Sequence, residues 1–394
     1  MAAALFWSSL ALVAYAYGGY MVVLVGCDAV AALRANARWL SSDGDRRRAG
    51  SVDDWPFVTV LVAAYNEEAC LKEKIENTLA LDYPPDRLEI LIGSDGSTDR
   101  TDGIVEELAR PNVRLSRAPR VGKAAVLNRL VREAKGTRLL FTDANTRLAP
   151  DVLRRLVERM RGGEVGGACG RLRLVTPSGG APAEGLYWRY ENLLKLYESR
   201  RGALMGANGG VYLLRRSEWR ELQPDTIVDD FLVTMRVLLA GRKLTYVPEA
   251  VAVEETAADL QGERVRRVRI AAGNFQSLRE LWPLLFRPSF VSFAFWSHKL
   301  LRWVAPGILV VLLAANVTLA ARPLYACLLG LQLAFYLAAL LLPSGKGAVG
   351  RIVHFARYFV EMNAAMMLGF VKFARGRQAS TWQRTGRPPT RRAA

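Results

Sequence analysis

The apolar positions of this chain gather at its two ends, while the middle mixes apolar and polar residues. Residues 5–25 contain no charged side chain, and about twenty such residues suffice for a helix to cross the hydrocarbon core of a bilayer. The segment has neither the basic leader nor the cleavage site of a signal peptide, so we predict a retained anchor within residues 1–30. The C-terminal residues 304–373 predict further membrane helices, at about 305–320, 324–342 and 352–371.

The middle of the chain, residues 31–260, has the pattern of a soluble α/β domain. Short apolar runs at 58–64, 89–94 and 138–142 predict buried strands, and the first two are followed by polar turn residues and then a helical pattern. This alternation is typical of a mainly parallel, Rossmann-like sheet, whose ligands bind beyond the carboxyl ends of the strands. We therefore expect the chemistry at those strand ends.

Basic segments adjoin the apolar ones. Residues 261–303 begin with an amphipathic pattern in which Val268, Ala272 and Phe275 share one face, and this predicts helices that lie in the membrane interface. Arginines that follow the anchor place the central domain in the cytoplasm by the positive-inside rule. Three later spans would leave the basic tail, residues 374–394, on the opposite side, so one of them is expected to be re-entrant or interfacial.

The last predicted span carries ionisable side chains on one helical face, His354, Arg357 and Glu361. At membrane depth such groups should face protein or water. Two interpretations stay open: the face lines a passage for acceptor or product, or Arg357 and Glu361 form a satisfied pair inside a helical bundle.

The net charge of +17 raises the question of a nucleic-acid partner. The arginines cluster beside apolar segments and no aromatic-interleaved basic motif occurs, so we expect anionic membrane lipids as partners and no nucleic acid. The four cysteines are scattered without metal-ligand spacing, which suits a reducing compartment.

Polar clusters stand at three predicted strand ends: Tyr65-Asn66-Glu67, Ser94-Asp95-Gly96 and Thr142-Asp143-Ala144-Asn145. Carboxylates and amides converging at one edge of a parallel sheet suit a hydroxyl-rich ligand with a metal-bound diphosphate. The glycine-rich fingerprint of dinucleotide-binding folds and the P-loop pattern are both absent from the sequence, which disfavours hydride transfer.

From about Val58 onward, the ordered motifs AAYNEE, SDGSTD, VGKAAVLN, FTDANT, GANGG, VDDF and RVRRVRIAAGNFQ resemble those of membrane-integrated, inverting family 2 glycosyltransferases. That group includes cellulose, hyaluronan and poly-N-acetylglucosamine synthases. The resemblance implies a GT-A-type fold flanked by transmembrane and interface helices. It also implies transfer of a sugar from a UDP-sugar donor, with Mg²⁺ or Mn²⁺ as cofactor.

By the same resemblance, the donor is bound from the strand ends and from the arginine-rich helix. Asp143 and Asn145 would hold the metal, with Asn145 replacing the second acid of the family motif; a neutral amide ligand there should weaken but not abolish metal dependence. The implied donor-binding residues are Tyr65, Glu67, Asp95, Lys123, Asp143, Arg266 and Arg269.

Asp230 aligns with the catalytic acid of the family. An inverting reaction requires a base that accepts the proton of the acceptor hydroxyl, and a carboxylate can do this; the simpler interpretation of Asp230 is an acid in the first turn of a helix. Asn208, Gly209 and Asp229 are predicted on the acceptor side, where small residues let a substrate approach. GANGG could equally be a plain turn.

The family's Q-x-x-R-W motif is altered here, because Ile270 stands where the tryptophan is expected. This departure puts processive synthesis in doubt more than sugar transfer. We predict transfer to a growing polysaccharide at the cytoplasmic face of the plasma (inner) membrane, by a multi-pass protein with a partner subunit or as a homo-oligomer. The alternatives are single addition to a lipid, and a catalytically silent nucleotide-sugar-binding regulator.

Overall fold

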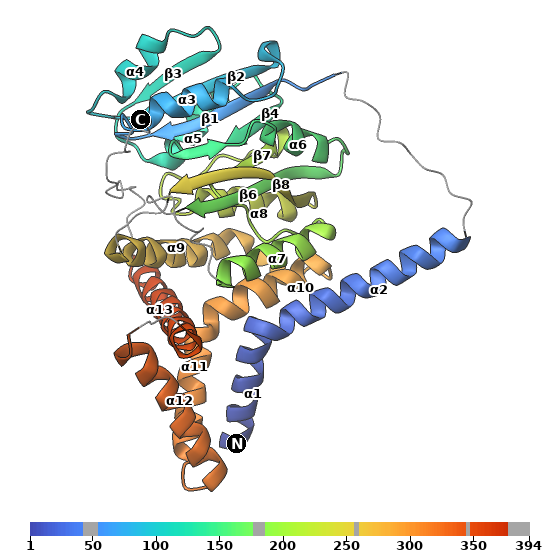
Figure 1. Ribbon diagram of the computed structural model, residues 1–394, viewed down its shortest axis with the longest axis vertical. Helices are drawn as coiled ribbons and strands as arrows, with labels where there is room; N and C mark the ends of the chain where they lie inside the picture. The colour runs from blue at the N-terminus through green and yellow to red at the C-terminus, as the bar shows by residue number, and fades with distance from the viewer. Residues whose placement is uncertain (42–53, 176–185, 256–259, 344–346, 377–394) are drawn as a thin grey trace.

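The computed structural model describes residues 1–41, 54–175, 186–255, 260–343 and 347–376 (Figure 1). The arginines at 46–48 and the tail beyond residue 376 lie outside the described residues. A sheet domain occupies one end of the protein, and apolar helices project from the other end.

Eight strands form one sheet in the order β3-β2-β1-β4-β7-β6-β8-β5. In the half made by β3, β2, β1 and β4 all strands are parallel, and β1 and β2 are buried along their whole length, as their apolar sequences require. Strand β7 is antiparallel to both of its neighbours, β4 and β6. The predicted mainly parallel sheet is thus confirmed, with mixed pairing in the second half. The strands are Val58–Ala64 (β1), Leu88–Asp95 (β2), Val113–Ala118 (β3), Arg138–Phe141 (β4), Thr146–Leu148 (β5), Val165–Val175 (β6), Tyr212–Arg215 (β7) and Lys243–Glu255 (β8).

Helices cover both faces of the sheet. Leu71–Leu79 (α3), Thr101–Leu108 (α4) and Val152–Arg159 (α6) pack on one face. Lys123–Glu133 (α5), Leu186–Arg200 (α7) and Asp229–Leu239 (α8) belong to the core of the other face. That second core continues without a break into the membrane-side helices, since Tyr20, Leu24, Phe295 and Trp303 belong to it. The core of the sheet domain is therefore continuous with the nearest part of the membrane-side helices.

Three helices of the described part are long and apolar enough to cross a membrane: Ala2–Leu33, Phe290–Thr318 and Pro323–Leu341. The first contains Ala2–Ala14 (α1), the π-helical turn Tyr15–Gly19 (η1) and much of Tyr20–Ser41 (α2), so it extends past the predicted anchor limit of residue 30. The second contains Phe290–Ala294 (α10), the π-helical turn Phe295–Leu300 (η5) and Leu301–Thr318 (α11), and the third is α12. The predicted boundary at residue 303 falls inside one continuous helix.

The segment predicted as a last span forms a helix, Ala348–Ala374 (α13), but it is not among those three candidates. It packs against the amphipathic helix Leu260–Leu281 (α9), which leads into the short turn Trp282–Leu285 (η4). At the crossing, a Cβ atom on Gly369 would lie 2.4 Å from the Cβ of Ala271 and 2.8 Å from the backbone nitrogen of Ala272. Only glycine lets the two helices approach this closely.

The Arg357–Glu361 pair considered for this helix is not formed. The Arg357 guanidinium instead donates to the carbonyl oxygens of Ala339, at 3.1 Å, and Leu342. It thereby satisfies carbonyls at the C-terminal end of α12 that have no helical donor of their own. Arg357 therefore joins two helices.

A cluster of buried polar residues ties α7 to the membrane-side helices, and we call it the membrane-side cluster: Tyr20, Glu191, Glu198, His298 and Arg302. The ring nitrogens of His298 contact Glu198 Oε1 at 2.6 Å and Glu191 Oε2 at 3.3 Å. Tyr20 donates to Glu198 at 3.0 Å, and Arg302 pairs with Glu191. Every carboxylate in the cluster thus has at least two partners, as burial demands.

Candidate active site

The first two strand-end loops are locked together. The Asn66 side chain accepts from the backbone nitrogen of Thr98 at 2.8 Å, and the backbone nitrogen of Glu67 donates to Thr101 Oγ1 at 2.8 Å. Asn66 has a φ of 54°, a conformation that asparagine tolerates better than most residues. The two motifs therefore build one wall at the carboxyl ends of β1 and β2. The Glu67 side chain, a predicted donor ligand, is buried in this wall.

Asp95 ends β2 with a fully buried carboxylate. It accepts hydrogen bonds from the backbone nitrogens of Val121 and Gly122, at 2.7 and 2.9 Å, and from Arg120 at 2.9 Å. The Arg120 guanidinium lies 3.2 Å from the centre of the Tyr65 ring. Asp95 thus fixes the loop that precedes Lys123 and places Tyr65 beside it.

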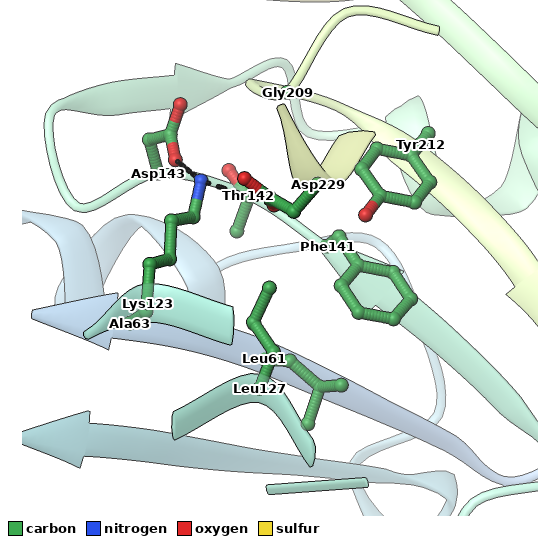
Figure 2. Close-up of a pocket in the computed structure, with 10 residues that line it drawn as sticks. All are labelled: Leu61, Ala63, Lys123, Leu127, Phe141, Thr142, Asp143, Gly209, Tyr212 and Asp229. Carbon is green, nitrogen blue, oxygen red and sulfur yellow. Dashed lines mark hydrogen bonds and ion pairs between the residues drawn. The ribbon is translucent and has the colours of Figure 1, made fainter. Parts of the chain in front are cut away.

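Lys123, the first residue of α5, reaches the ends of two other elements. Its Nζ lies 3.1 Å from Asp143 Oδ1, after β4, and 3.4 Å from Asp229 Oδ2, at the start of α8. Figure 2 shows the ammonium between these carboxylates. Burial alone would lower the pKa of Lys123, but Asp143, Asp229 and Asp230 together raise it well above its usual value. Lys123 therefore stays positively charged at neutral pH.

Asp230 lies in the same first turn of α8. Its Oδ1 accepts the backbone N–H of Phe231 at 2.8 Å. A Cβ atom on Gly209 would lie 3.0 Å from Asp230 Oδ2 and 3.5 Å from Asp143 Oδ2, so this glycine separates the two carboxylates. Burial, followed by the charge of Asp229, raises the pKa of Asp230 to about 6. A carboxylate with this pKa is a stronger base than an ordinary aspartate.

The two predicted arginines of α9 behave differently. Arg266 makes two hydrogen bonds to Glu263, at 2.7 and 3.0 Å. Arg269 has no hydrogen-bond partner among the residues that the structure describes. Burial lowers the pKa of Arg269, while Asp229, Asp230 and Asp143 raise it. Arg269 therefore faces the acidic cluster with its guanidinium available for an anion.

A small pocket of about 10 Å³ lies where these elements meet. It is lined by Lys123, Asp143, Gly209, Tyr212 and Asp229 on its polar side, and by Leu61, Ala63, Leu127 and Phe141 below (Figure 2). Of the carboxylates predicted to share one cavity, Asp143 lines it. Asp230 flanks Gly209 at its edge, and Asp95 is one layer behind, under the loop before Lys123.

Two residues near the site were not predicted. Lys74 is fully buried in α3, and its Nζ donates to Thr142 Oγ1 at 2.7 Å and to the carbonyl oxygen of Thr146 at 2.6 Å, on either side of Asp143 and Asn145. Burial lowers the pKa of Lys74 to about 7. Tyr212, on β7, has a buried hydroxyl without a partner among the described residues.

The donor set can be tested for a metal. Among the described residues, no three histidine, cysteine, aspartate or glutamate side chains are arranged so that they could hold a metal ion by themselves. Asp143 is about one-third exposed, and the buried Nδ2 of Asn145 has no partner in the described chain. One carboxylate and one amide fit a cation that is held mainly by substrate phosphates, which is the usual mode for Mg²⁺. Both residues thus suit a metal that arrives with a diphosphate.

Two family models match this chain. Residues 59–218 match the model described as glycosyl transferase family 2, and residues 139–341 match the one described as glycosyl transferase family group 2. The second match covers more than half of the 394 residues. The chain belongs to glycosyl transferase family group 2. This confirms the family that the ordered motifs predicted.

Relatives of this family 2 chain include synthases of two kinds. It is 28% identical over 251 residues to a beta-monoglucosyldiacylglycerol synthase of Nostoc sp., with 59% of this chain and 52% of the relative covered. It is 27% identical over 227 residues to a poly-beta-1,6-N-acetyl-D-glucosamine synthase of Staphylococcus aureus, with 55% of each covered. The chain thus spans about half the length of these curated relatives.

One solved structure matches the family 2 chain along nearly its whole length. The mannosyltransferase PcManGT from Pyrobaculum calidifontis, in complex with GDP-Man and Mn²⁺, aligns with a TM-score of 0.67 and 26% identity, over 94% of this chain and 99% of that one. The alignment confirms the predicted GT-A-type fold and extends into the membrane-side helices.

Proposed function

We propose that this protein is an inverting glycosyltransferase in which Asp230 is the catalytic base. The supporting observation is the placement of Asp230 and Asp143 on the two sides of Gly209, with Lys123 and Arg269 at the same cluster. The base and the cationic groups thus lie in one cluster around Gly209. This is the arrangement of charge that displacement of a diphosphate requires.

The reaction forms a bond between the acceptor oxygen and the anomeric carbon of the donor sugar and breaks the bond from that carbon to the diphosphate. The hydroxyl proton goes to Asp230, whose raised pKa suits a proton acceptor. Lys123 and Arg269 pair with the departing diphosphate. A divalent cation held by Asp143 and Asn145 would neutralise further phosphate charge.

The donor is a nucleoside diphosphate sugar. The UDP-sugar expected from the motifs remains our proposal for the donor. The nearly full-length structural match was solved with GDP-Man, so the guanine nucleotide is the competing possibility. The wall made by Tyr65, Glu67 and Asp95 is the proposed nucleotide side of the site.

We place the acceptor at the membrane. The first span and α12 meet at the far end of the protein, because Trp7 Nε1 donates to the Tyr325 hydroxyl at 3.2 Å (Figure 1). With three crossings and the N-terminus outside, the sheet domain, α13 and the basic tail all lie on the cytoplasmic side. Treating α13 as a surface helix thus removes the conflict over the tail.

The acceptor is a membrane lipid or a growing polysaccharide. Ile270, in place of the expected tryptophan, favours single addition to a lipid, in line with the glucosyldiacylglycerol synthase relative. The poly-N-acetylglucosamine synthase relative supports the polysaccharide. Product length after incubation distinguishes the two, since only the latter produces a ladder.

The test is nucleotide release by the purified full-length protein in detergent, with UDP- and GDP-sugars and with Mg²⁺ or Mn²⁺. Wild type should release nucleotide with one donor class. Asp230→Asn should lose about 10²–10⁴-fold in rate, while Asp86→Asn, an exposed aspartate on the sheet domain, should not change it. Absence of release with every donor would favour the silent regulator.

A further inference from the structure

Two lysines lie on the membrane side of Asp230, outside the donor cluster. The Lys195 Nζ, on α7, donates to Asn208 Oδ1 at 2.5 Å, next to Gly209. The Lys299 Nζ, on η5, lies 5.8 Å from the centre of the ring of Phe231, the residue after Asp230. Both lysines are half-buried. Both lysines therefore contact residues that adjoin the proposed site: Asn208 precedes Gly209, and Phe231 follows Asp230.

Neither lysine forms an ion pair with the described residues. The nearby carboxylates act on Lys299 from a distance but are bonded elsewhere. Glu191 is paired with Arg302 and His298, and Glu198 accepts from Tyr20 and from the backbone nitrogen of Met205 at 3.2 Å. The positive charges of the two ammonium groups are thus not balanced by a paired carboxylate among the described residues.

The amide between the lysines and the site is also incomplete. The Nδ2 of Asn208 is buried without a partner among the described residues, although its Oδ1 is held by Lys195. A buried N–H group without an acceptor destabilises the protein unless a ligand completes it. The Asn208 amide nitrogen lacks an acceptor, and the two ammonium groups lack a carboxylate partner among the described residues, so an anionic acceptor of hydrogen bonds would suit all three.

Lys299 stands inside a helix that is apolar enough to span a membrane. An ionisable group at such a position normally faces a polar passage or a ligand, because burial in lipid is costly. Lysine pairs with phosphate as a point charge. A phosphate carries the acceptor oxygens and the negative charge that these three groups lack.

We propose that Lys195, Lys299 and Asn208 bind a phosphate carried by the acceptor, so that the acceptor is a lipid-linked saccharide phosphate. The inference rests on the proposed function. The phosphate is not the nucleophile, because a phosphate needs no base and Asp230 is placed to take a proton from a hydroxyl. The saccharide hydroxyl forms the new bond at Asp230, and the phosphate linkage stays intact.

The experiment uses the full-length protein in nanodiscs of phosphatidylcholine, with a fixed donor and two acceptors that carry the same sugar. One is linked to a polyprenyl chain through phosphate, and the other is linked to diacylglycerol without phosphate. Wild type should show a KM about 10-fold lower for the phosphate-linked acceptor. Equal KM values for the two acceptors would overturn the proposal.

The variants Lys195→Met and Lys299→Met should each raise the KM for the phosphate-linked acceptor about 10-fold, with kcat within about twofold. They should leave the KM for the neutral acceptor unchanged. Lys195→Arg should restore most of the affinity, and Lys135→Met, at an exposed lysine of the sheet domain, is the matched control. Equal effects on both acceptors would contradict the proposal.

Donor hydrolysis without acceptor separates the possible failures. If both lysine variants hydrolyse donor as wild type does but show no acceptor discrimination, the phosphate site is wrong and the transferase stands. If wild type hydrolyses no donor, the proposed function fails first. A lysine effect that follows added phosphatidylglycerol, with the neutral acceptor, would assign the site to bulk lipid and overturn the proposal.

Discussion

Two charged clusters of this protein use the same chemistry for different ends. At the strand ends, Asp143, Asp229 and Asp230 surround Lys123, and Arg269 has no hydrogen-bond partner in the described part of the chain. In the membrane-side cluster, Glu191 and Glu198 are saturated by Arg302, His298 and Tyr20. The first cluster is left electrostatically incomplete and is the proposed ligand site; the second is complete and holds helices together.

The contrast teaches where to look for function in such a chain. Burial of a charge is not itself a sign of a site, because well-paired buried charges can be architectural. An unpaired cation or a carboxylate with a raised pKa is the better indicator. Four predictions test this division, beginning with the largest effect.

Arg302→Met should break the complete cluster. Removal of Arg302 leaves the buried Glu191 without its guanidinium partner, which should cost about 3–5 kcal/mol of stability. Denaturation in detergent measures the loss. Arg87→Met removes an exposed pair with Asp86 and should cost at most about 1 kcal/mol. Equal losses in the two variants would contradict the architectural role of the membrane-side cluster.

Gly209→Ala should damage the incomplete cluster without unfolding the protein. The new methyl group would stand 3.0 Å from Asp230 Oδ2, so the carboxylates must move by a few tenths of an ångström. We expect kcat to fall about 10–100-fold, because small misplacements of catalytic groups are costly. Gly162→Ala has open space around its Cβ position and is the control. A fully active Gly209→Ala variant would show that catalysis does not depend on the small size of residue 209 beside the two carboxylates.

Lys74→Met removes the buried support beneath Asp143 and Asn145. The loop then loses hydrogen bonds at Thr142 and Thr146, and we expect the KM for donor in the presence of Mn²⁺ to rise about 3–10-fold. Lys72→Met, an exposed lysine in the same helix, should leave it unchanged. Binding of Mn²⁺ with nucleoside diphosphate, followed by electron paramagnetic resonance, gives a readout apart from turnover. Unaltered binding would remove Lys74 from the site.

The pH dependence should be the smallest effect. Because Asp230 must be deprotonated to act, kcat/KM should rise with pH to a plateau, with a midpoint near pH 6. Asp229→Asn removes a charge that raises this pKa, so the midpoint should fall by about 0.5–1 pH unit. A midpoint that rises or stays would contradict the assigned coupling.

The same shift has a consequence for stability. The pKa of Asp230 is raised from 3.8 to about 6 in the folded state. Its protonated form therefore stabilises the fold below about pH 4, and this contribution is lost as pH rises through 6. Activity and this stability term thus change in opposite directions across the same pH window.

The strand-end cluster could be predicted because its information is local. Strands β1, β2 and β4 are continuous apolar runs, and Asp95 and Asp143 follow or end them directly. The ordered motifs then identified the family. Strands such as Tyr212–Arg215 escaped prediction because four residues of mixed character have no clear periodicity.

The membrane-side cluster could not be predicted for the opposite reason. Its contacts join residues 100 to 178 positions apart, such as His298 with Glu198 and Tyr20 with Glu198. In the sequence, Lys74 resembles a residue on the solvent-exposed face of an amphipathic helix, yet its side chain is buried in the structure. Helix α13, predicted as a third C-terminal span, is not among the three helices of the described chain that are apolar enough to cross a membrane.

The close crossing of α9 and α13 at Gly369 constrains how such proteins can diverge or be re-engineered. Backbone touches backbone there, so no side-chain adjustment can absorb a change in either helix. A chimera that takes its C-terminal helices from a relative must take helix α9 with them, or the position of Arg269 relative to the acidic cluster will change. The two helices are in effect a single exchangeable module.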